Sequence, residues 1–432
     1  MERPAHIILL AAGACDALGT VLRPAAVALR GHRILAVGRP EAIASAHRGR
    51  DTAIQERPRE VVLPALVNAH AHLDLTLLGP RPYGGNFMAW LRDIAQCRRA
   101  DPRLPRESVA AGLEQSQSAG VGVVGDIAGT AEAAQARLES PEPGQMPGVS
   151  FVECFGVGRR QVDGFIELAR RLGQLPGAEK LHAEEGALGL QPHAPYSAGA
   201  ALYAAAGQLA EARGYRLCTH LAESPAELQF VRDAAGPFAR LLADLGKWDE
   251  SVMKPTGLHP VEWLEPELRR GDWLVAHCNY LAQAHIQTLA ACRVSVAYCP
   301  LASEYFGFPD RGRHPYRELL AHGVNVCLGT DSILCQPPGQ PQPLGILPQM
   351  RRLYQRDRTD PLTLLRMATV NGLKALGMKH TLASLLPGAP ARLIAVEINP
   401  QDPADLLMQA LAGTTPASVV HWARVERQPF LE

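Results

Sequence analysis

The stretch LPALVNAHAHLDLT, residues 63–76, contains the pattern that decides the fold. An apolar run typical of a buried strand ends in His70 and His72, and Asp74 follows them. Because side chains two residues apart on a strand point to the same face, we expect the two imidazoles to project together. They can share a cation such as zinc, or they can be two hydrogen-bonded polar residues in the mouth of a loop. The other polar residues of the chain have to separate these alternatives.

Seven further apolar runs follow the first one, separated by Ala/Leu-rich segments of helical character. The eight predicted strands are VVLPALV (61–67), VGVVGDI (121–127), VSFVECFG (149–156), LGLQPHA (188–194), YRLCTHL (215–221), DWLVAHC (272–278), RVSVAYC (293–299) and VNVCLGTD (324–331). Apolar strands that alternate with helices are typical of a parallel sheet covered on both faces. Eight such units predict an α/β fold with a (β/α)8 barrel of the TIM type, whose active site lies at the carboxyl ends of the strands.

Both ends of the chain differ from this central region. The segments HIILLAAGAC (6–15) and AVALRGHRILAVG (26–38) predict strands, and GAPARLIAVEI (388–398) and ASVVHWARVE (417–426) return to strand character. We therefore predict a small β-sandwich domain formed by both termini, from residues 1–60 and 380–432. The barrel is predicted to occupy residues 61–379.

The composition narrows the function classes. Lys plus Arg equals Asp plus Glu, at 43 each, so no basic surface predicts a nucleic-acid partner. No apolar run is long enough to cross a membrane. The nine cysteines are scattered without a C-x-x-C pair, which is typical of reduced thiols in a cytoplasmic protein. We expect a cytoplasmic protein that acts on a small molecule.

Polar residues collect where the predicted strands end. They are His70 and His72 after the first strand, His193 after the fourth, His220 and Glu223 after the fifth, His277 after the sixth and Asp331 after the eighth. Each one alone is explained as a capping or core residue. If these residues are buried together at one rim, each polar group without a partner lowers the stability of the fold by roughly 1–3 kcal/mol. Their grouping therefore predicts a metal site that satisfies them.

These motifs resemble the amidohydrolase superfamily of metal-dependent hydrolases. The similarity covers nearly the whole chain and includes ATVNGLKALG (368–377) and SLLPGAPARLIAV (384–396) after the barrel. The segments HAPYS, HLAES and GTDS are similar to the group that holds the chlorohydrolases and the guanine, cytosine and adenosine-type deaminases. Arg392 departs from the family pattern, which usually has Asp there, but it lies outside the predicted barrel.

The resemblance implies one divalent metal ion, with zinc as the default for this set of ligands and iron as the alternative. The implied ligands are His70, His72, His220 and Asp331. Relatives with two metals use a carboxylated lysine at the end of the fourth strand, where LGLQPHAPYS has none. Lys180 lies well upstream, and we interpret it as a solvated charge.

The resemblance also implies roles in catalysis. Asp331 accepts a proton from water, and His277 hydrogen-bonds the reacting centre. Glu223 protonates a ring nitrogen and then carries a proton to the leaving amine, although a helix N-terminal carboxylate is the alternative interpretation. His193 is expected to contact the substrate. Phe87 and Trp90 either line the mouth of the site or pack its lid, and packing is the favoured interpretation.

The predicted function is hydrolytic deamination of a 6-aminopurine nucleoside. Within the group, the chain looks like the aminodeoxyfutalosine deaminases of menaquinone biosynthesis, whose substrate carries a benzoate. Tyr305, Phe306 and Phe308 could stack on that second ring, and Arg311 and Arg313 could pair with its carboxylate. The alternatives are an adenosine or S-adenosylhomocysteine-type deaminase, a chlorohydrolase or cyclic amidase, and a metal-stabilised binding protein. Related enzymes are often dimers, so a homodimer is one expected assembly.

Overall fold

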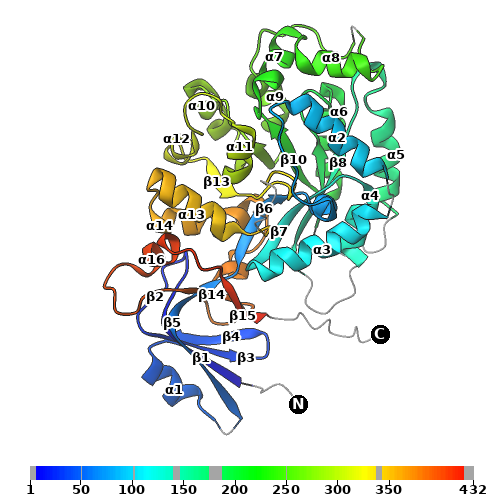
Figure 1. Ribbon diagram of the computed structural model, residues 1–432. Helices are drawn as coiled ribbons and strands as arrows, with labels where there is room; N and C mark the ends of the chain where they lie inside the picture. Colours follow the sequence, from blue (N-terminus) through cyan, green and yellow to red (C-terminus); the bar gives the residue numbers. More distant parts are fainter. Residues whose placement is uncertain are drawn as a thin grey trace.

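The protein forms two domains, a large barrel and a smaller sheet domain that contains both ends of the described chain (Figure 1). The residues that this computed structural model describes are 6–49, 51–100, 103–139, 146–174, 187–249, 251–336 and 343–422. Lys180 lies outside the described residues.

The large domain is a barrel of eight parallel strands that neighbour one another in sequence order. Its strands are β6 (Leu66–Ala71), β7 (Val121–Ala128), β8 (Gly148–Cys154), β9 (Ala187–Pro192), β10 (Arg216–Leu221), β11 (Trp273–His277), β12 (Ser295–Tyr298) and β13 (Asn325–Leu328). Strands such as β6, β7 and β8 are buried along their whole length, because helices cover the outside of the barrel. The predicted (β/α)8 barrel is confirmed.

Helices follow the strands and surround the barrel (Figure 1). They are η1 (Leu73–Leu78), α2 (Phe87–Ala100), α3 (Leu104–Ser118), α4 (Ala131–Glu139), η2 (Gly158–Arg160), α5 (Asp163–Leu172), α6 (Ala200–Arg213), α7 (Pro225–Asp233), α8 (Pro237–Asp244), α9 (Pro260–Leu268), α10 (Gln283–Ala291), α11 (Pro300–Phe306), α12 (Tyr316–Ala321), α13 (Ile346–Asp357), α14 (Pro361–Met367), α15 (Val370–Ala375) and η3 (His380–Ala383). Proline opens α7, α8 and α9, because its fixed φ suits the first helical turn. Within the described part of the chain, no helix is both long and apolar enough to cross a membrane.

Apolar side chains fill the interior of the barrel. Leu373 and Leu376, from α15 and the residue after it, pack with Leu382 of η3 against Val67 and Phe151 of the strands. This packed core leaves the carboxyl ends of the strands as the place for a polar site.

The first and last strands, β6 and β13, close the barrel at a seam. The carbonyl oxygen of His70 accepts the backbone N–H groups of Thr330 and Asp331, both at 3.0 Å. Asn68 crosses the same seam, because its Nδ2 donates to Thr330 Oγ1 at 2.8 Å and its Oδ1 accepts the Thr330 N–H at 3.1 Å. Gly329 permits this approach, since a Cβ there would lie 2.9 Å from the Cβ of His70. The seam therefore places the segment GTDS directly beside the first histidine.

The smaller domain is built from both termini, as predicted. Its elements are β1 (His6–Cys15), β2 (Val21–Leu22), β3 (Ala25–Arg30), β4 (Arg33–Gly38), α1 (Pro40–His47), β5 (Thr52–Pro64), β14 (Arg392–Glu397), α16 (Leu406–Ala412) and β15 (Ser418–Trp422). The strands pair in the order β15-β14-β5-β1-β3-β4, with β2 beside β1. Alternate residues of β1 face two separate apolar cores: Ile8 packs near Ile43 of α1, and Leu9 packs with Val27 on the other face.

The first predicted strand, VVLPALV, is divided between the two domains. Its residues 61–64 end β5, which pairs with β14 of the small sheet, and β6 begins at Leu66. Pro64 is the last residue of β5; proline has no N–H to continue a ladder. The predicted domain boundary after residue 60 therefore falls within β5.

Candidate active site

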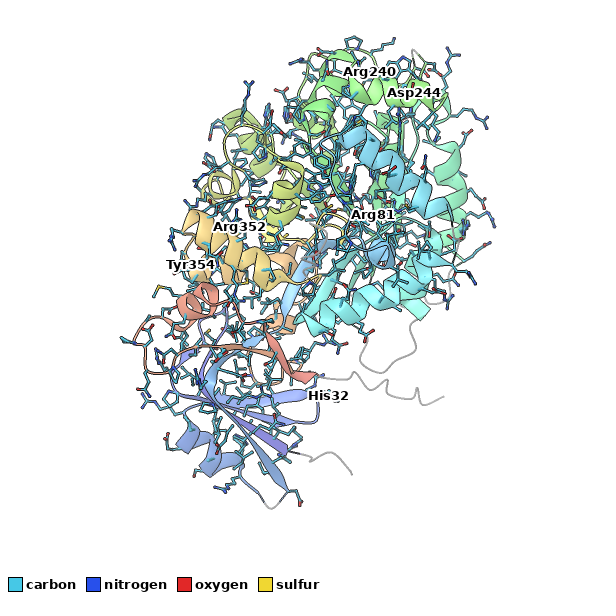
Figure 2. The ribbon with its side chains drawn as sticks, viewed as in Figure 1. His32, Arg81, Arg240, Asp244, Arg352 and Tyr354 are labelled. Atoms are coloured by element: carbon cyan, nitrogen blue, oxygen red, sulfur yellow. The ribbon has the colours of Figure 1, made fainter. Side chains whose placement is uncertain are left out.

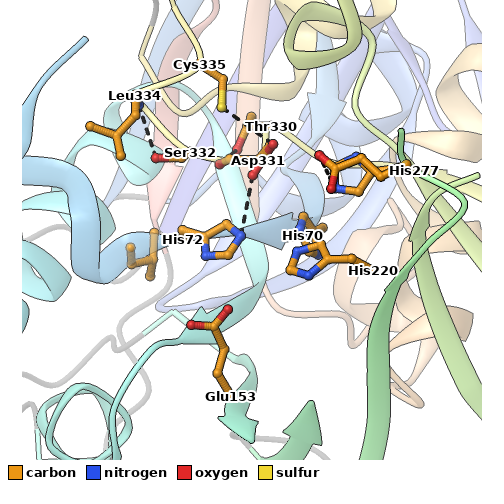
Figure 3. A network of polar contacts seen from close by, with 12 residues as sticks. His70, His72, Glu153, His220, His277, Thr330, Asp331, Ser332, Leu334 and Cys335 are labelled. Atoms are coloured by element: carbon orange, nitrogen blue, oxygen red, sulfur yellow. Dashed lines mark hydrogen bonds and ion pairs between the residues drawn. The ribbon is translucent and has the colours of Figure 1, made fainter. Parts of the chain in front are cut away.

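Four histidines and one aspartate meet at the carboxyl ends of the barrel strands (Figure 3). His70 lies on β6 and His72 directly follows it, His220 lies on β10, His277 ends β11, and Asp331 follows β13. The ring centre of His70 is 5.3 Å from that of His72 and 5.1 Å from that of His220. His72 Nε2 is 3.4 Å from Asp331 Oδ1. The structure thus brings the four predicted metal ligands together.

Two overlapping sets of three residues could hold a metal ion within the described chain. One set is His70, His72 and Asp331, and the other is His70, His220 and His277; within each set the ligand atoms lie within 4.8 Å of one another. His277, to which we gave a catalytic role, is therefore also close enough to be a ligand.

The donor atoms of this cluster fit a bound cation. Both ring nitrogens of His70 and Nδ1 of His72 are buried and have no hydrogen-bond partner among the described residues. Burial, together with the neighbouring imidazoles, lowers the pKa of His70 and of His72 well below the usual value. Both rings are therefore neutral at pH 7, which is the form that binds metal. Buried nitrogens without partners are costly unless a ligand satisfies them, so the residues present suit a divalent ion.

His220 is oriented by a neighbouring strand end. Its Nδ1 donates to the carbonyl oxygen of His193 at 3.0 Å, which leaves Nε2 with a lone pair for a cation. His193 follows β9, and its side chain lines a cavity that is also lined by His220 and Asp331. Its Nδ1 contacts Ser197 Oγ at 2.7 Å, which fixes the ring beside His220.

Two of these residues have unusual backbone conformations. His277 has a φ of 73° and Asp331 a φ of 60°, in the left-handed region that non-glycine residues rarely adopt. Such conformations cost of order 1–3 kcal/mol each and persist where the surrounding structure enforces them. Their position at the end of two barrel strands is typical of a functional site.

Glu223 follows β10 and lines the same cavity. Its Oε1 lies 3.7 Å from His277 Nε2. Burial, and then the nearby carboxylates of Asp331 and Glu227, raise the pKa of Glu223 well above its usual value. A carboxyl group that holds its proton near neutral pH can act as an acid.

Glu227, which we did not predict as a site residue, is a carboxylate in the first turn of helix α7. It has the helix N-terminal role that was the alternative interpretation of Glu223. Its Oε1 accepts the backbone N–H of Ala222 and its Oε2 that of Glu223, both at 2.8 Å. Within the described residues, the carboxyl of Glu223 accepts no backbone hydrogen bond, so it stays available for proton transfer. The available signal was the spacing in HLAESPAE, where Glu227 enters the first turn of α7 just after Ser224, its N-cap.

A second buried charge cluster borders the cavity, and we did not predict it either. Arg98 of α2 donates from Nη1 to Glu153 Oε2 at 2.7 Å, and its Nη2 lies 3.2 Å from Asp74 Oδ2. Glu153 lies near the end of β8 and is 4% exposed. The signal for Glu153 was a carboxylate near the carboxyl end of a predicted barrel strand, VSFVECFG.

Aromatic side chains close the cavity, whose volume is about 80 Å³. Phe87 and Trp90 of α2 and Phe306 of α11 line it, with Trp90 and Phe306 ring centres 4.9 Å apart. We define the aromatic lid as these three residues with Tyr83, Tyr305 and Phe308, which pack against them. Pockets for ligands of drug size measure roughly 300–1,000 Å³, so this closed cavity is smaller than such a pocket.

Helix α2 is held on two sides. Arg98 ties its inner side to the barrel through Glu153 and Asp74. On its outer side, Arg92 pairs with Asp244 of α8, which Figure 2 shows at the edge of the barrel. Both partners of the outer pair are about half exposed, so this pair adds at most about 1 kcal/mol. The buried cluster is the stronger anchor.

The two arginines of the loop after β12 do not reach the cavity. Arg313 is 71% exposed and pairs with Asp357 of α13 at 3.2 Å, and Arg311 is exposed. Neither lines the cavity. The suggested pairing with a substrate carboxylate therefore has no support from this geometry, because Asp357 draws Arg313 towards the outside.

A larger cavity, of about 530 Å³, lies on the small sheet between β5 and β14. Its lining contains Glu56, Arg57, Arg59, Glu60 and Glu397 but no histidine, and these charged groups are exposed or half-buried. We place the active site at the smaller cavity, because the buried imidazoles and carboxyl groups gather there.

Comparison with known proteins identifies the family of this chain. Residues 61–421 match the Amidohydrolase family, so the chain belongs to this family. The chain is therefore a hydrolase. A 5-methylthioadenosine/S-adenosylhomocysteine deaminase of Pelotomaculum thermopropionicum is 30% identical over 398 residues, which cover 87% of this chain and 81% of the relative.

Two further proteins bear on the substrate. An aminodeoxyfutalosine deaminase of Deinococcus radiodurans is 26% identical over 387 residues, covering 84% of this chain and 85% of the relative. The crystal structure of Helicobacter pylori aminofutalosine deaminase with methylthio-coformycin superposes with a TM-score of 0.77 at 19% identity, covering 95% of this chain and 97% of that chain. At that identity the likeness shows the fold. These relatives are named as enzymes that act on carbon–nitrogen bonds.

Proposed function

We propose that the chain is a metal-dependent deaminase of a 6-aminopurine nucleoside, with 6-aminodeoxyfutalosine of menaquinone biosynthesis as its substrate and ammonia as a product. The observation that carries the deaminase assignment is Glu223, a buried carboxyl group with a raised pKa beside His277 and the predicted metal ligands. Loss of ammonia from an aromatic ring needs a proton donor at this place. The nine free cysteine thiols suit the cytoplasmic location expected from the sequence.

One divalent ion, zinc by preference for these ligands, is proposed to be held by His70, His72, His220 and Asp331. When bound, it would supply the Lewis acidity that makes water a nucleophile near neutral pH. His70 and His72 would present the nitrogens that have no other partner, and His220 would present Nε2.

The chain's own groups perform the proton transfers. Asp331 takes a proton from the attacking water. Glu223 gives its proton to a nitrogen of the purine ring, which makes the adjacent carbon electrophilic. As the carbonyl forms, Glu223 takes the hydroxyl proton of the tetrahedral adduct and passes it to the leaving amine, and the proton held by Asp331 then returns to Glu223. His277 donates a hydrogen bond to the reacting oxygen, and Glu227 keeps Glu223 in place through two backbone N–H groups.

The choice of 6-aminodeoxyfutalosine rests on similarity and on the aromatic lid. A relative and a structural neighbour carry that activity in their names. Phe306 and its neighbours offer faces on which a benzoate ring could stack. A second candidate is a 5-methylthioadenosine or S-adenosylhomocysteine deaminase, which the 30% identical relative favours.

The test is an ammonia-release assay on the metal-loaded protein. We expect kcat/KM for 6-aminodeoxyfutalosine to exceed that for adenosine, 5′-methylthioadenosine and S-adenosylhomocysteine by at least about tenfold, the ratio given by one favourable contact of ~1.4 kcal/mol. A preference for either sulfur nucleoside would assign the second candidate instead. No ammonia from any of the four would contradict the deaminase assignment.

A further inference from the structure

Glu153 is a buried carboxylate with one oxygen that has no partner. Its Oε2 accepts a hydrogen bond from Arg98 Nη1 at 2.7 Å. Its Oε1 has no hydrogen-bond partner among the described residues, although the side chain lines the active-site cavity. A buried acceptor is normally satisfied by protein, water or ligand, so this oxygen marks a place for a donor group.

Arg98 does not serve the second oxygen in this geometry: its Nη2 pairs with Asp74 at 3.2 Å, and its Nε has no hydrogen-bond partner among the described residues. Two carboxylates thus share one guanidinium, and the cluster presents net negative charge to the cavity. Burial alone would raise the pKa of Glu153, but Arg98, and after it His193, outweigh burial and lower that pKa. Glu153 is therefore an ionised acceptor at neutral pH.

Glu153 also lies on a side of the site away from the proton-transfer groups. Figure 3 shows its carboxylate pointing towards His72 and His220, with Asp331 and Cys335 on the opposite side of these imidazoles. His193 Nε2 is 3.6 Å from Glu153 Oε1, which is too far for a direct hydrogen bond. A substrate that reacts beside Glu223 and Asp331 would therefore extend its unreactive part towards Glu153 and His193.

We propose that Glu153 is a substrate-binding residue whose Oε1 accepts a hydrogen bond from the 2′- or 3′-hydroxyl of the nucleoside sugar. This inference rests on the proposed function and names the group that recognises the ribose. The sugar hydroxyls are the available donors, since the 6-amino group of the purine is engaged at the reaction centre. A carboxylate is a well-suited acceptor for ribose hydroxyls, and its negative charge disfavours an anionic group at the same place. A carboxylate on the substrate would accordingly lie elsewhere, towards the aromatic lid.

The test compares adenosine with 2′,3′-dideoxyadenosine, which differ only at the hydroxyls and react at the same distant carbon. The wild-type enzyme is expected to show a kcat/KM roughly 10- to 100-fold higher for adenosine, as for loss of a hydrogen bond to a charged group. In Glu153→Gln the amide oxygen serves Arg98 and the NH₂ group replaces the acceptor. This variant should lose most of the preference, with kcat/KM for the dideoxy compound changed less than about threefold.

The matched control is Asp74→Asn, which removes a carboxylate from the same guanidinium but does not line the cavity. It should keep the preference for adenosine. Equal losses on both substrates in Glu153→Gln, or a wild-type enzyme that does not distinguish them, would overturn the inference while the deaminase assignment stands. A wild-type enzyme that does not distinguish the two nucleosides overturns the inference even if the variant fails to fold. If the wild-type enzyme deaminates no nucleoside at all, the proposed function fails, and this inference fails with it.

Discussion

Replacing Glu227 by glutamine tests whether the loop after β10 is held by this one side chain. The carboxylate accepts two backbone N–H groups, from Ala222 and Glu223, both at 2.8 Å. Glutamine has one carbonyl oxygen, so one N–H loses its acceptor and faces an NH₂ group. A buried N–H without a partner costs ~1–3 kcal/mol, which is the expected loss in the free energy of unfolding. The displaced loop should also misplace the carboxyl of Glu223, and a shift of about 1 Å can lower kcat by about 100-fold.

The measurement combines urea unfolding, metal analysis and kcat at pH 8, because burial raises the pKa of Glu227 to about 7 and the carboxylate is ionised above that pH. Glu262→Gln is the matched control: Glu262 accepts the backbone N–H of His259 at 2.8 Å at the start of α9, outside the site. It should keep kcat and most of its stability, because Glu262 accepts one N–H group, which the glutamine oxygen can still accept. A Glu227→Gln enzyme with wild-type kcat, or an equal fall in kcat in both variants, would refute the reasoning.

Three further outcomes are expected. Wild-type protein should contain about one tightly bound ion per chain, and alanine at any proposed ligand should remove it, whereas His277→Ala should keep it; two ions per chain, or loss in His277→Ala, would contradict the ligand set. Glu223→Gln should keep its metal and its fold but lower kcat by about 10²–10⁴-fold, and near-normal turnover would reduce Glu223 to a structural role. Burial, and then His285, lowers the pKa of His259 to about 4. Because the unfolded imidazole takes up a proton below about pH 6.5, stability is lost as pH falls from about 6.5 to 4. His259→Asn should weaken this dependence by at most about 2 kcal/mol in urea unfolding at pH 7 and pH 5, and an unchanged dependence would show that the pKa of His259 is not lowered.

The barrel could be predicted from sequence because its strands are buried on both faces and therefore read as uninterrupted apolar runs. The grouping of His70, His220 and Asp331 followed from the same reasoning, since parallel strands bring their carboxyl ends to one rim. The bounds of the first strand could not be predicted, because Val61–Pro64 and β6 are equally apolar and their division depends on pairing with β14.

Side chains that arrive from helices and loops were not predictable. Arg98 lies in a charged helical segment, where a single arginine is indistinguishable from surface charge until the packing of α2 turns it inward. Its partner Glu153 lies near the carboxyl end of β8, which is a signal for a site residue, but its pairing with Arg98 depends on that packing. Arg313 shows the opposite case: the sequence placed it in an active-site loop, but Asp357 holds it outside.

The seam between β6 and β13 has a consequence for how the protein is made. Asn68 and Thr330, which cross it, are 262 residues apart in the chain. During synthesis on a ribosome the amino-terminal part of the chain emerges first. Asp331 can therefore contact His70 and His72 only after the last barrel strand has been synthesised. Closing so long a loop is entropically costly and slow, so these contacts form late in folding. A nascent or truncated chain can therefore contain seven barrel strands and most of the core while still lacking a complete site.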